Sequence, residues 1–328
     1  MALPIPAVDV PPQPWTGRFD GDDAAHLRWW QAVGEYDGGA GGVRAEGPMG
    51  GTGGEDARPA TLLGFASDEG VRRTKGRTGA ATAPAAIRKA LGPLAFHLDR
   101  GVSDAGDVVV SGGELEAGQE RAGRAVAALL EAGQLTAVLG GGHETAFASY
   151  LGVAASAPVQ GGRRLGILNL DAHFDLRDEA VATSGTPFLQ MARAEAAAGR
   201  DFRYAVVGIS EPHTTRALFD TAQRLGVRYL LDEECEAERV RTFVAGFLDG
   251  IDVLYLTIDL DVLPAAVAPG VSAPAAYGVP LPVIAAVCRQ VAWSGKLLHL
   301  DIAELNPALD VDGRTARVAA RLLNSLLR

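Results

Sequence analysis

Two short clusters of acidic and histidine side chains follow apolar runs in this chain. The first, Asp171-Ala172-His173-Phe174-Asp175, comes directly after 165–170, and the second, Asp259-Leu260-Asp261, comes after a run that begins at 253. Both apolar runs are typical of buried strands, and polar side chains at the ends of core strands are costly unless something offsets their loss of water. A pair of metal ions would do so, which makes a metal-dependent hydrolase the first hypothesis.

The residues of each cluster lie two apart, and in an extended segment such positions point to one side. Asp171, His173 and Asp175 could therefore reach one centre, and Asp259 and Asp261 repeat the pattern. The four carboxylates would balance two divalent cations. A ligand set without a thiol favours an oxygen-binding ion such as Mn²⁺, and two such ions can bridge a water and lower its pKa.

A glycine-rich turn, Gly140-Gly141-Gly142-His143-Glu144, follows the predicted strand 136–139. Three glycines allow a sharp turn whose backbone lies close to other atoms, and they would present His143 at the start of a helix. A plain structural turn and a phosphate-binding loop are the rival interpretations. The spacing fits neither of the common glycine-rich phosphate motifs, which disfavours the phosphate-binding loop.

Glu304 follows the last predicted strand, 297–301. A carboxylate in this place could pair with a cationic substrate group such as an amidinium, although a helix-capping or surface glutamate has the same spacing. Asp301 is predicted to be structural, bonded to a ligand histidine. His26, His97, His213 and His299 match no ligand spacing and are predicted to be structural, with His213 the least certain of them.

Strands and helices alternate along the chain from residue 61, which predicts an α/β fold: one three-layer αβα domain around a central, mostly parallel sheet of about eight strands. Ligands of such sheets bind at the carboxyl ends of the strands, where the motifs above fall. The predicted strands are 61–65, 107–110, 136–139, 165–170, 203–207, 227–230, 253–258 and 297–301. The predicted helices are 83–91, 115–132, 144–155, 187–198, 215–225, 237–250, 281–293 and 313–327.

Residues 1–60 are predicted to form an N-terminal arm and residues 61–328 the single catalytic domain. Trp29 and Trp30 are expected to dock the arm onto the body. Nine glycines fall between Gly38 and Gly54, which predicts a flexible surface loop, either an insertion without function or a mobile lid.

Composition limits the classes of partner. The 328 residues are 48% hydrophobic, enough for a large core, and the net charge of −10 argues against a nucleic-acid partner. No apolar run approaches the roughly 20 residues that span a bilayer, and the N-terminus lacks a signal pattern, so no membrane association and a cytoplasmic location are expected. The two cysteines, Cys235 and Cys288, are predicted to be buried thiols. A homo-oligomer is possible.

Taken together, the glycine turn with His143, the Asp171-Ala172-His173-Phe174-Asp175 cluster, the Asp259-Leu260-Asp261 cluster and the segment 301–307 resemble the motifs of the ureohydrolase superfamily, which contains arginase, agmatinase and formimidoylglutamase. The resemblance spans roughly residues 61–327 and implies an arginase-like fold with two Mn²⁺ ions. It implies that one ion is held by His143, Asp171, Asp175 and Asp259, and the other by Asp171, His173, Asp259 and Asp261.

The same resemblance implies a mechanism. A hydroxide bridging the metals would attack an amidine-type carbon, Asp175 would bind that hydroxide and help pass a proton to the leaving amine, and Glu304 would hold the amidinium. Ser184 stands where arginases carry a proposed proton-shuttle histidine, which argues against arginine as substrate. That departure and the Gly140–Glu144 turn point to the formimidoylglutamase branch.

The substrate of that branch is N-formimidoyl-L-glutamate, an intermediate of histidine degradation, which is cleaved to L-glutamate and formamide. Its two carboxylates need cations, and Arg177 is the best candidate for a bidentate clamp, with a surface ion pair as the rival. Ser184 and Arg77 are further substrate-binding candidates, the latter within the basic patch Arg72, Arg73, Lys75 and Arg77. The alternatives are a ureohydrolase of a guanidino compound such as agmatine or a guanidino acid, a metal-binding protein without turnover, and a nucleotide-binding module.

Overall fold

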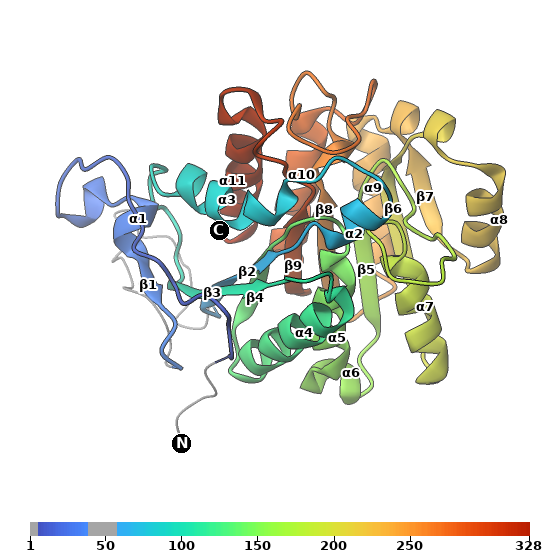
Figure 1. Ribbon diagram of the computed structural model, residues 1–328, viewed down its shortest axis with the longest axis horizontal. Coiled ribbons are helices and arrows are strands. Elements are labelled where there is room, and N and C mark those ends of the chain that lie inside the picture. The colour runs from blue at the N-terminus through green and yellow to red at the C-terminus, as the bar shows by residue number, and fades with distance from the viewer. Residues whose placement is uncertain (1–5, 39–57) are drawn as a thin grey trace.

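A computed structural model describes residues 6–38 and 58–328, and its centre is one sheet of nine strands, all paired in parallel (Figure 1). The strand order is β1-β3-β2-β4-β9-β8-β5-β6-β7. The strands are β1 (Val33–Glu35), β2 (Ala60–Ala66), β3 (Val102–Val109), β4 (Leu135–Leu139), β5 (Leu165–Leu170), β6 (Tyr204–Ile209), β7 (Arg228–Leu231), β8 (Val253–Asp259) and β9 (Leu297–Ala303).

Helices cover both faces of the sheet, which gives the predicted three-layer α/β architecture. The helices are α1 (Trp29–Ala32), α2 (Glu69–Arg73), α3 (Ala83–Leu91), α4 (Leu115–Glu131), α5 (Thr145–Ala155), α6 (Ala157–Gln160), α7 (Pro187–Ala197), α8 (Arg216–Arg224), α9 (Ala237–Leu248), α10 (Leu281–Trp293) and α11 (Arg314–Leu326). Within the described ranges, no helix combines the length and apolarity needed to cross a membrane.

Successive residues of the buried strands enter different cores because strand side chains alternate between the two faces. In β8, Leu254 and Leu256 pack with α3, α9, α10 and α11, whereas Val253 and Tyr255 face the core that includes α5, α7 and α8. A third cluster, built on Leu63 of β2, lies against α4 on the same face as α5. Burial on both faces explains why these strands read as continuous apolar runs.

The order of the central strands brings the predicted site residues together. Strands β4, β9, β8 and β5 are consecutive neighbours, and parallel pairing puts their carboxyl ends at one edge of the sheet. The glycine turn follows β4, the first acidic cluster follows β5, the second lies at the end of β8, and Glu304 follows β9. Segments far apart in sequence therefore meet at one place.

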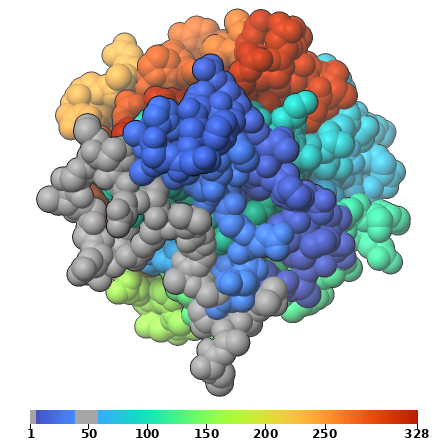
Figure 2. Space-filling view, turned by 90° about the vertical axis from the view of Figure 1, so that its left-hand side faces the viewer, coloured from blue at the N-terminus to red at the C-terminus, as the bar shows by residue number. Residues whose placement is uncertain are grey.

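The N-terminal arm adds the strand that the sequence did not predict, so the sheet has nine strands rather than about eight. Strand β1 pairs with β3, and the indole nitrogen of the buried Trp29 donates a hydrogen bond to Asn324 of α11 at 2.9 Å. Figure 2 shows the arm beside the C-terminal residues at this end of the molecule. Trp29 therefore docks the arm as predicted. The predicted glycine-rich loop, apart from Gly38, lies outside the described residues.

Strand β3 begins at Val102, five residues before the predicted start. The prediction missed the first half of the strand because that half is polar. Asp104 is buried in that half, where Arg88 and the indole of Trp15 bind its carboxylate. A strand whose polar residues are satisfied by such partners carries no apolar signal in the sequence. Cys235 and Cys288 are buried free thiols, as predicted, and burial raises the pKa of each to about 12.

Candidate metal centre

The turn after β4 needs glycine because the backbone passes very close to its neighbours. A β-carbon at Gly141 would overlap the backbone oxygen of Ser67, and the Gly142 N–H donates to that same oxygen at 2.9 Å. The turn ends at His143, which is 1% exposed and precedes α5. The three-glycine pattern thus positions this histidine through close backbone approach.

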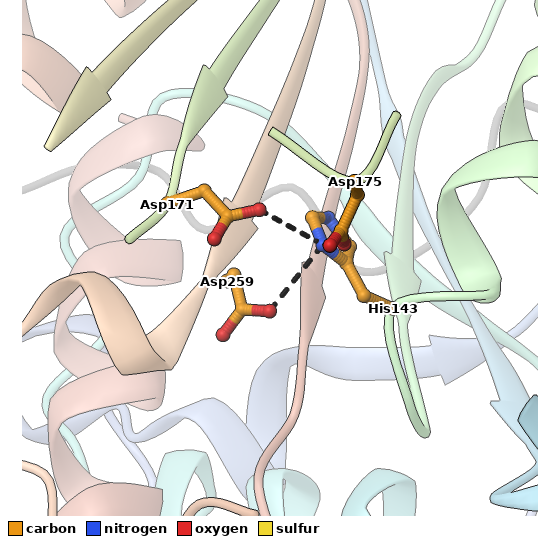
Figure 3. A group of neighbouring side chains, drawn as sticks. All are labelled: His143, Asp171, Asp175 and Asp259. Atoms are coloured by element: carbon orange, nitrogen blue, oxygen red, sulfur yellow. Dashed lines mark hydrogen bonds and ion pairs between the residues drawn. The ribbon is translucent and has the colours of Figure 1, made fainter. Parts of the chain in front are cut away.

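Three carboxylates surround one nitrogen of His143 (Figure 3). Its Nδ1 lies 2.8 Å from Asp175 Oδ2, 3.1 Å from Asp171 Oδ2 and 3.3 Å from Asp259 Oδ2. One ligand-type atom from each of the four residues falls within 4.8 Å of the others. The four predicted residues therefore form one group with the geometry of a cation site.

A second group, made of Asp171, His173 and Asp261, lies next to the first and shares Asp171 with it. Asp259, which was also predicted for this second set, falls in the first group only. Nδ1 of His173 lies 3.1 Å from Asp261 Oδ2 and 3.5 Å from Asp171 Oδ1. Asp171 thus turns one oxygen toward His143 and the other toward His173. A carboxylate placed in this way can bridge two cations, and the structure brings together all six predicted metal-binding residues.

The side chains of each cluster converge because the backbone turns. The sequence analysis expected them to converge because the backbone is extended, and that explanation is wrong. The Asp171 carboxylate accepts a hydrogen bond from the backbone N–H of His173 at 2.6 Å, and Asp259 accepts from the N–H of Asp261 at 2.8 Å. Aspartate favours such turns because its short side chain reaches the N–H two residues on. Asp175 has a φ of 47°, in the left-handed region, which further bends the first cluster.

The carboxylates of this cluster are buried and repel one another, so bound positive charge would stabilise them. Burial raises the pKa of Asp175 and Asp259, and the neighbouring carboxylate of Asp171 adds to both shifts. Burial alone would lower the pKa of His143, but its bonds to Asp171 and Asp175 and the charge of Asp259 raise it well above its usual value. Divalent cations in place of these protons would satisfy the carboxylates, so the donor set fits a pair of oxygen-binding metal ions.

Thr257 orients His143, a role that the sequence analysis missed. Its Oγ1 donates to Asp301 Oδ1 at 2.6 Å and lies 3.0 Å from Nε2 of His143, which must then donate to it. Asp301 is therefore structural, but it reaches the histidine through Thr257 rather than directly. Thr257 precedes Asp259 by two positions on the same strand, and this spacing was the available signal.

Glu304 lies beside the first group and is 6% exposed. Its Oε1 accepts a hydrogen bond from the His143 backbone N–H at 2.8 Å, and its own backbone is left-handed with a φ of 68°. Burial, with repulsion from Glu144, raises the pKa of Glu304 to about 8. A cation bound here would favour the ionised carboxylate.

A pocket of about 380 Å³ opens over both groups, and the predicted substrate-binding residues lie in its wall. Arg177 is exposed, and its side chain passes over Gly185, where a β-carbon would leave only 2.7 Å to Arg177 Cδ. Ser184 Oγ lies 3.4 Å from Thr74 Oγ1. The Arg77 guanidinium donates to the backbone oxygens of residues 271 and 272 at 2.8 and 2.9 Å, so it also fastens that loop.

The four histidines outside the motifs differ in burial and in their partners, and one of them contacts the site. His299 is buried against Thr136, and burial lowers its pKa to about 3. His26 is exposed and pairs with Asp23. His213 alone of these four forms a ring contact with a site residue in the described ranges, its ring centroid lying 6.5 Å from that of His173.

Comparison with known proteins agrees with this geometry. A formimidoylglutamase of Nocardia farcinica is 56% identical over 313 residues, which cover 95% of this chain and 95% of that protein. The crystal structure of formimidoylglutamase from Bacillus subtilis matches with a TM-score of 0.73 at 21% identity, covering 84% of this chain and 88% of that one. A Trypanosoma cruzi formiminoglutamase crystallised with two Mn²⁺ ions gives 0.72 at 26% identity, covering 84% and 95%. Residues 58–328 match the model of the Arginase family, and the chain belongs to that family.

Proposed function

We propose that this chain is a formimidoylglutamase that hydrolyses N-formimidoyl-L-glutamate to L-glutamate and formamide. The observation that carries the proposal is its near full-length likeness to a formimidoylglutamase, with over half of the residues identical. The two adjacent groups joined by Asp171 supply the polar machinery that such a hydrolysis needs. The wall of the pocket adds cations suited to a dicarboxylate.

Two Mn²⁺ ions would be the cofactors. His143, Asp171, Asp175 and Asp259 would hold one, and Asp171, His173, Asp259 and Asp261 the other. Support comes from the two groups, which contain every one of these ligands except Asp259 for the second ion, from the absence of thiol donors among their members, and from the two Mn²⁺ ions in the Trypanosoma cruzi formiminoglutamase. When bound, such ions supply Lewis-acid activation of a water and stabilise developing negative charge.

The side chains of the protein divide the remaining work. Glu304 would accept hydrogen bonds from the amidinium, because Oε1 is already fixed by the His143 N–H and Oε2 has no hydrogen-bond partner in the described chain. Asp175 would take one proton from the attacking water and pass it to the glutamate nitrogen, and the second proton of the water would also end on that nitrogen. The water oxygen bonds to the formimidoyl carbon while the bond from that carbon to the glutamate nitrogen breaks, giving formamide and L-glutamate.

The glutamate end of the substrate would be held by the pocket wall. Arg177 would pair with a carboxylate, since its guanidinium has no ion pair or hydrogen bond in the part of the chain that the structure describes. Ser184, near Arg177, would add a hydroxyl contact. Arg77 would act mainly by holding the loop at 271–272 in the wall.

One assay tests the activity. The purified protein with Mn²⁺ is offered formimidoylglutamate, arginine, agmatine and guanidinobutyrate, with formamide and urea both measured. We expect formamide from formimidoylglutamate and little urea from the guanidino compounds. Urea release from any guanidino compound at a higher kcat/KM would instead assign the chain to guanidine hydrolysis. Asp171→Asn is the matched control, because it keeps the shape of the side chain and loses the shared charge.

A further inference from the structure

We propose that Lys75 binds one of the two carboxylates of the substrate, together with Arg177, and so selects dicarboxylates. This inference rests on the proposed function and names a residue that determines its specificity. Three Lys and Arg side chains from the described residues line the pocket: Lys75, Arg77 and Arg177. They differ in whether their charge is already engaged.

The arginines around Lys75 are occupied. Arg77 gives two nitrogens of its guanidinium to backbone oxygens of the opposite loop. Arg72 and Arg73 both pair with Glu69, and Arg73 also pairs with Glu116. Of the predicted basic patch, Lys75 alone makes no hydrogen bond or ion pair through its side chain with any residue of the described chain.

The backbone of Lys75 supports a role for its side chain. The residue follows α2 with a φ of 61°, while its N–H bonds to the Arg72 oxygen at 3.0 Å and the Gly76 N–H bonds to the Val71 oxygen at 2.9 Å. Glycine is the usual residue in this left-handed position after a helix. A lysine here costs stability relative to glycine, and the residue is exposed and lines the pocket.

The chemistry of the substrate requires more than one cation. Both carboxylates of formimidoylglutamate must enter a pocket whose floor holds Asp175, Asp259, Asp261 and Glu304, and like charges repel. Lys75 and Arg177 come from different loops and are both unpaired in the described chain. Two cations for two carboxylates would let the site reject analogues that carry only one, because the unmatched cation would lose its partner.

The test compares Lys75→Met with the wild type on three substrates: formimidoylglutamate, formimidoylglutamine, which lacks the side-chain charge, and formimidoyl-4-aminobutyrate, which lacks the α-carboxylate. We expect KM for formimidoylglutamate to rise about tenfold to a hundredfold with kcat nearly unchanged. The loss should disappear for the analogue that lacks the carboxylate bound by Lys75. Lys75→Arg should keep most of the affinity.

Two further variants separate binding from folding. Lys75→Gly should lose affinity as Lys75→Met does, yet melt at the same or a higher temperature, since glycine fits the left-handed backbone. Lys89→Met, which changes another exposed lysine outside the pocket, should leave KM unchanged. L-glutamate binding, measured by calorimetry on the Mn²⁺-loaded protein, should weaken in Lys75→Met.

The outcomes distinguish this inference from the proposed function. Suppose that the wild type releases formamide from formimidoylglutamate. If the KM of Lys75→Met is then unchanged, or rises by the same factor for all three substrates, Lys75 binds no carboxylate and only the inference is overturned. If the wild type does not hydrolyse formimidoylglutamate, the proposed function fails and the assignment of Lys75 fails with it.

Discussion

The hydroxyl of Thr257 lies 3.0 Å from Nε2 of His143, on the side of the ring away from the acidic cluster. Because the hydroxyl already donates to Asp301, it accepts the Nε2 proton and leaves Nδ1 as the nitrogen that faces Asp171, Asp175 and Asp259. A threonine on β8 thus selects the form of the imidazole that can bind a metal ion.

The first prediction follows from this contact. Thr257→Val keeps the shape of the side chain but removes the acceptor, so the affinity for Mn²⁺ should fall by about 10–100-fold. Thr257→Ser keeps the hydroxyl and should bind nearly as the wild type. Competition with a fluorescent chelator measures both. Equal Mn²⁺ affinities for the valine and serine variants would show that the Thr257 hydroxyl does not determine which nitrogen of the His143 ring is protonated.

The shared position of Asp171 makes a second prediction about stoichiometry. Its two oxygens face different histidines, whereas Asp261 belongs to the second group alone. Asp171→Asn should therefore weaken both sites and abolish turnover, while Asp261→Asn should still retain about one ion per chain. Metal analysis after gel filtration gives the ratio. Retention of two ions by Asp171→Asn would contradict the bridging role.

The buried charges make stability depend on pH in the metal-free protein. The pKa values of His143, Asp175, Asp259 and Glu304 are all raised on folding, so the folded state holds more protons than the unfolded state. Stability must then fall as the pH rises, up to about 8 for Glu304. Between about pH 6 and pH 8 we expect a loss on the order of 1–3 kcal/mol in the free energy of unfolding.

Urea denaturation of the metal-free protein at several pH values measures this loss. Glu304→Gln, which stays neutral, should flatten part of the slope. Mn²⁺ should reverse it, since metal binding displaces protons and strengthens with pH. A free energy of unfolding that stays constant or rises with pH without metal would mean that these groups are not protonated in the folded protein.

Arg177 gives a fourth prediction, on substrate affinity. Arg177→Ala should raise KM for formimidoylglutamate about tenfold or more, with a smaller effect on kcat, because the lost ion pair lies away from the reacting carbon. Arg163→Ala, an exposed arginine before β5, is the matched control. Steady-state kinetics on both variants suffice. An unchanged KM in Arg177→Ala would show that Arg177 does not bind the substrate.

Much of the site could be predicted because its residues sit in short, dense motifs at the ends of apolar runs. Asp171, His173 and Asp175 follow one such run, and the rule that parallel strands share a carboxyl edge placed them on the same edge of the sheet as Asp259 and Asp261. The reason for convergence was not predictable in the same way. Turns closed by aspartate side chains and a left-handed Asp175 depend on backbone angles that apolar periodicity does not encode.

The sequence by itself determined the α/β class, the identities of the six clustered polar residues and the place of each after a strand, because these follow from patterns local in the chain. Tertiary structure alone decided that β4, β9, β8 and β5 are neighbours and that Thr257 orients His143. It also decided that Arg77 is engaged while the Lys75 side chain has no partner among residues 6–38 and 58–328. Those facts join residues up to some 200 positions apart. Only the packing of distant segments, driven by burial of their apolar faces, brings such residues into contact.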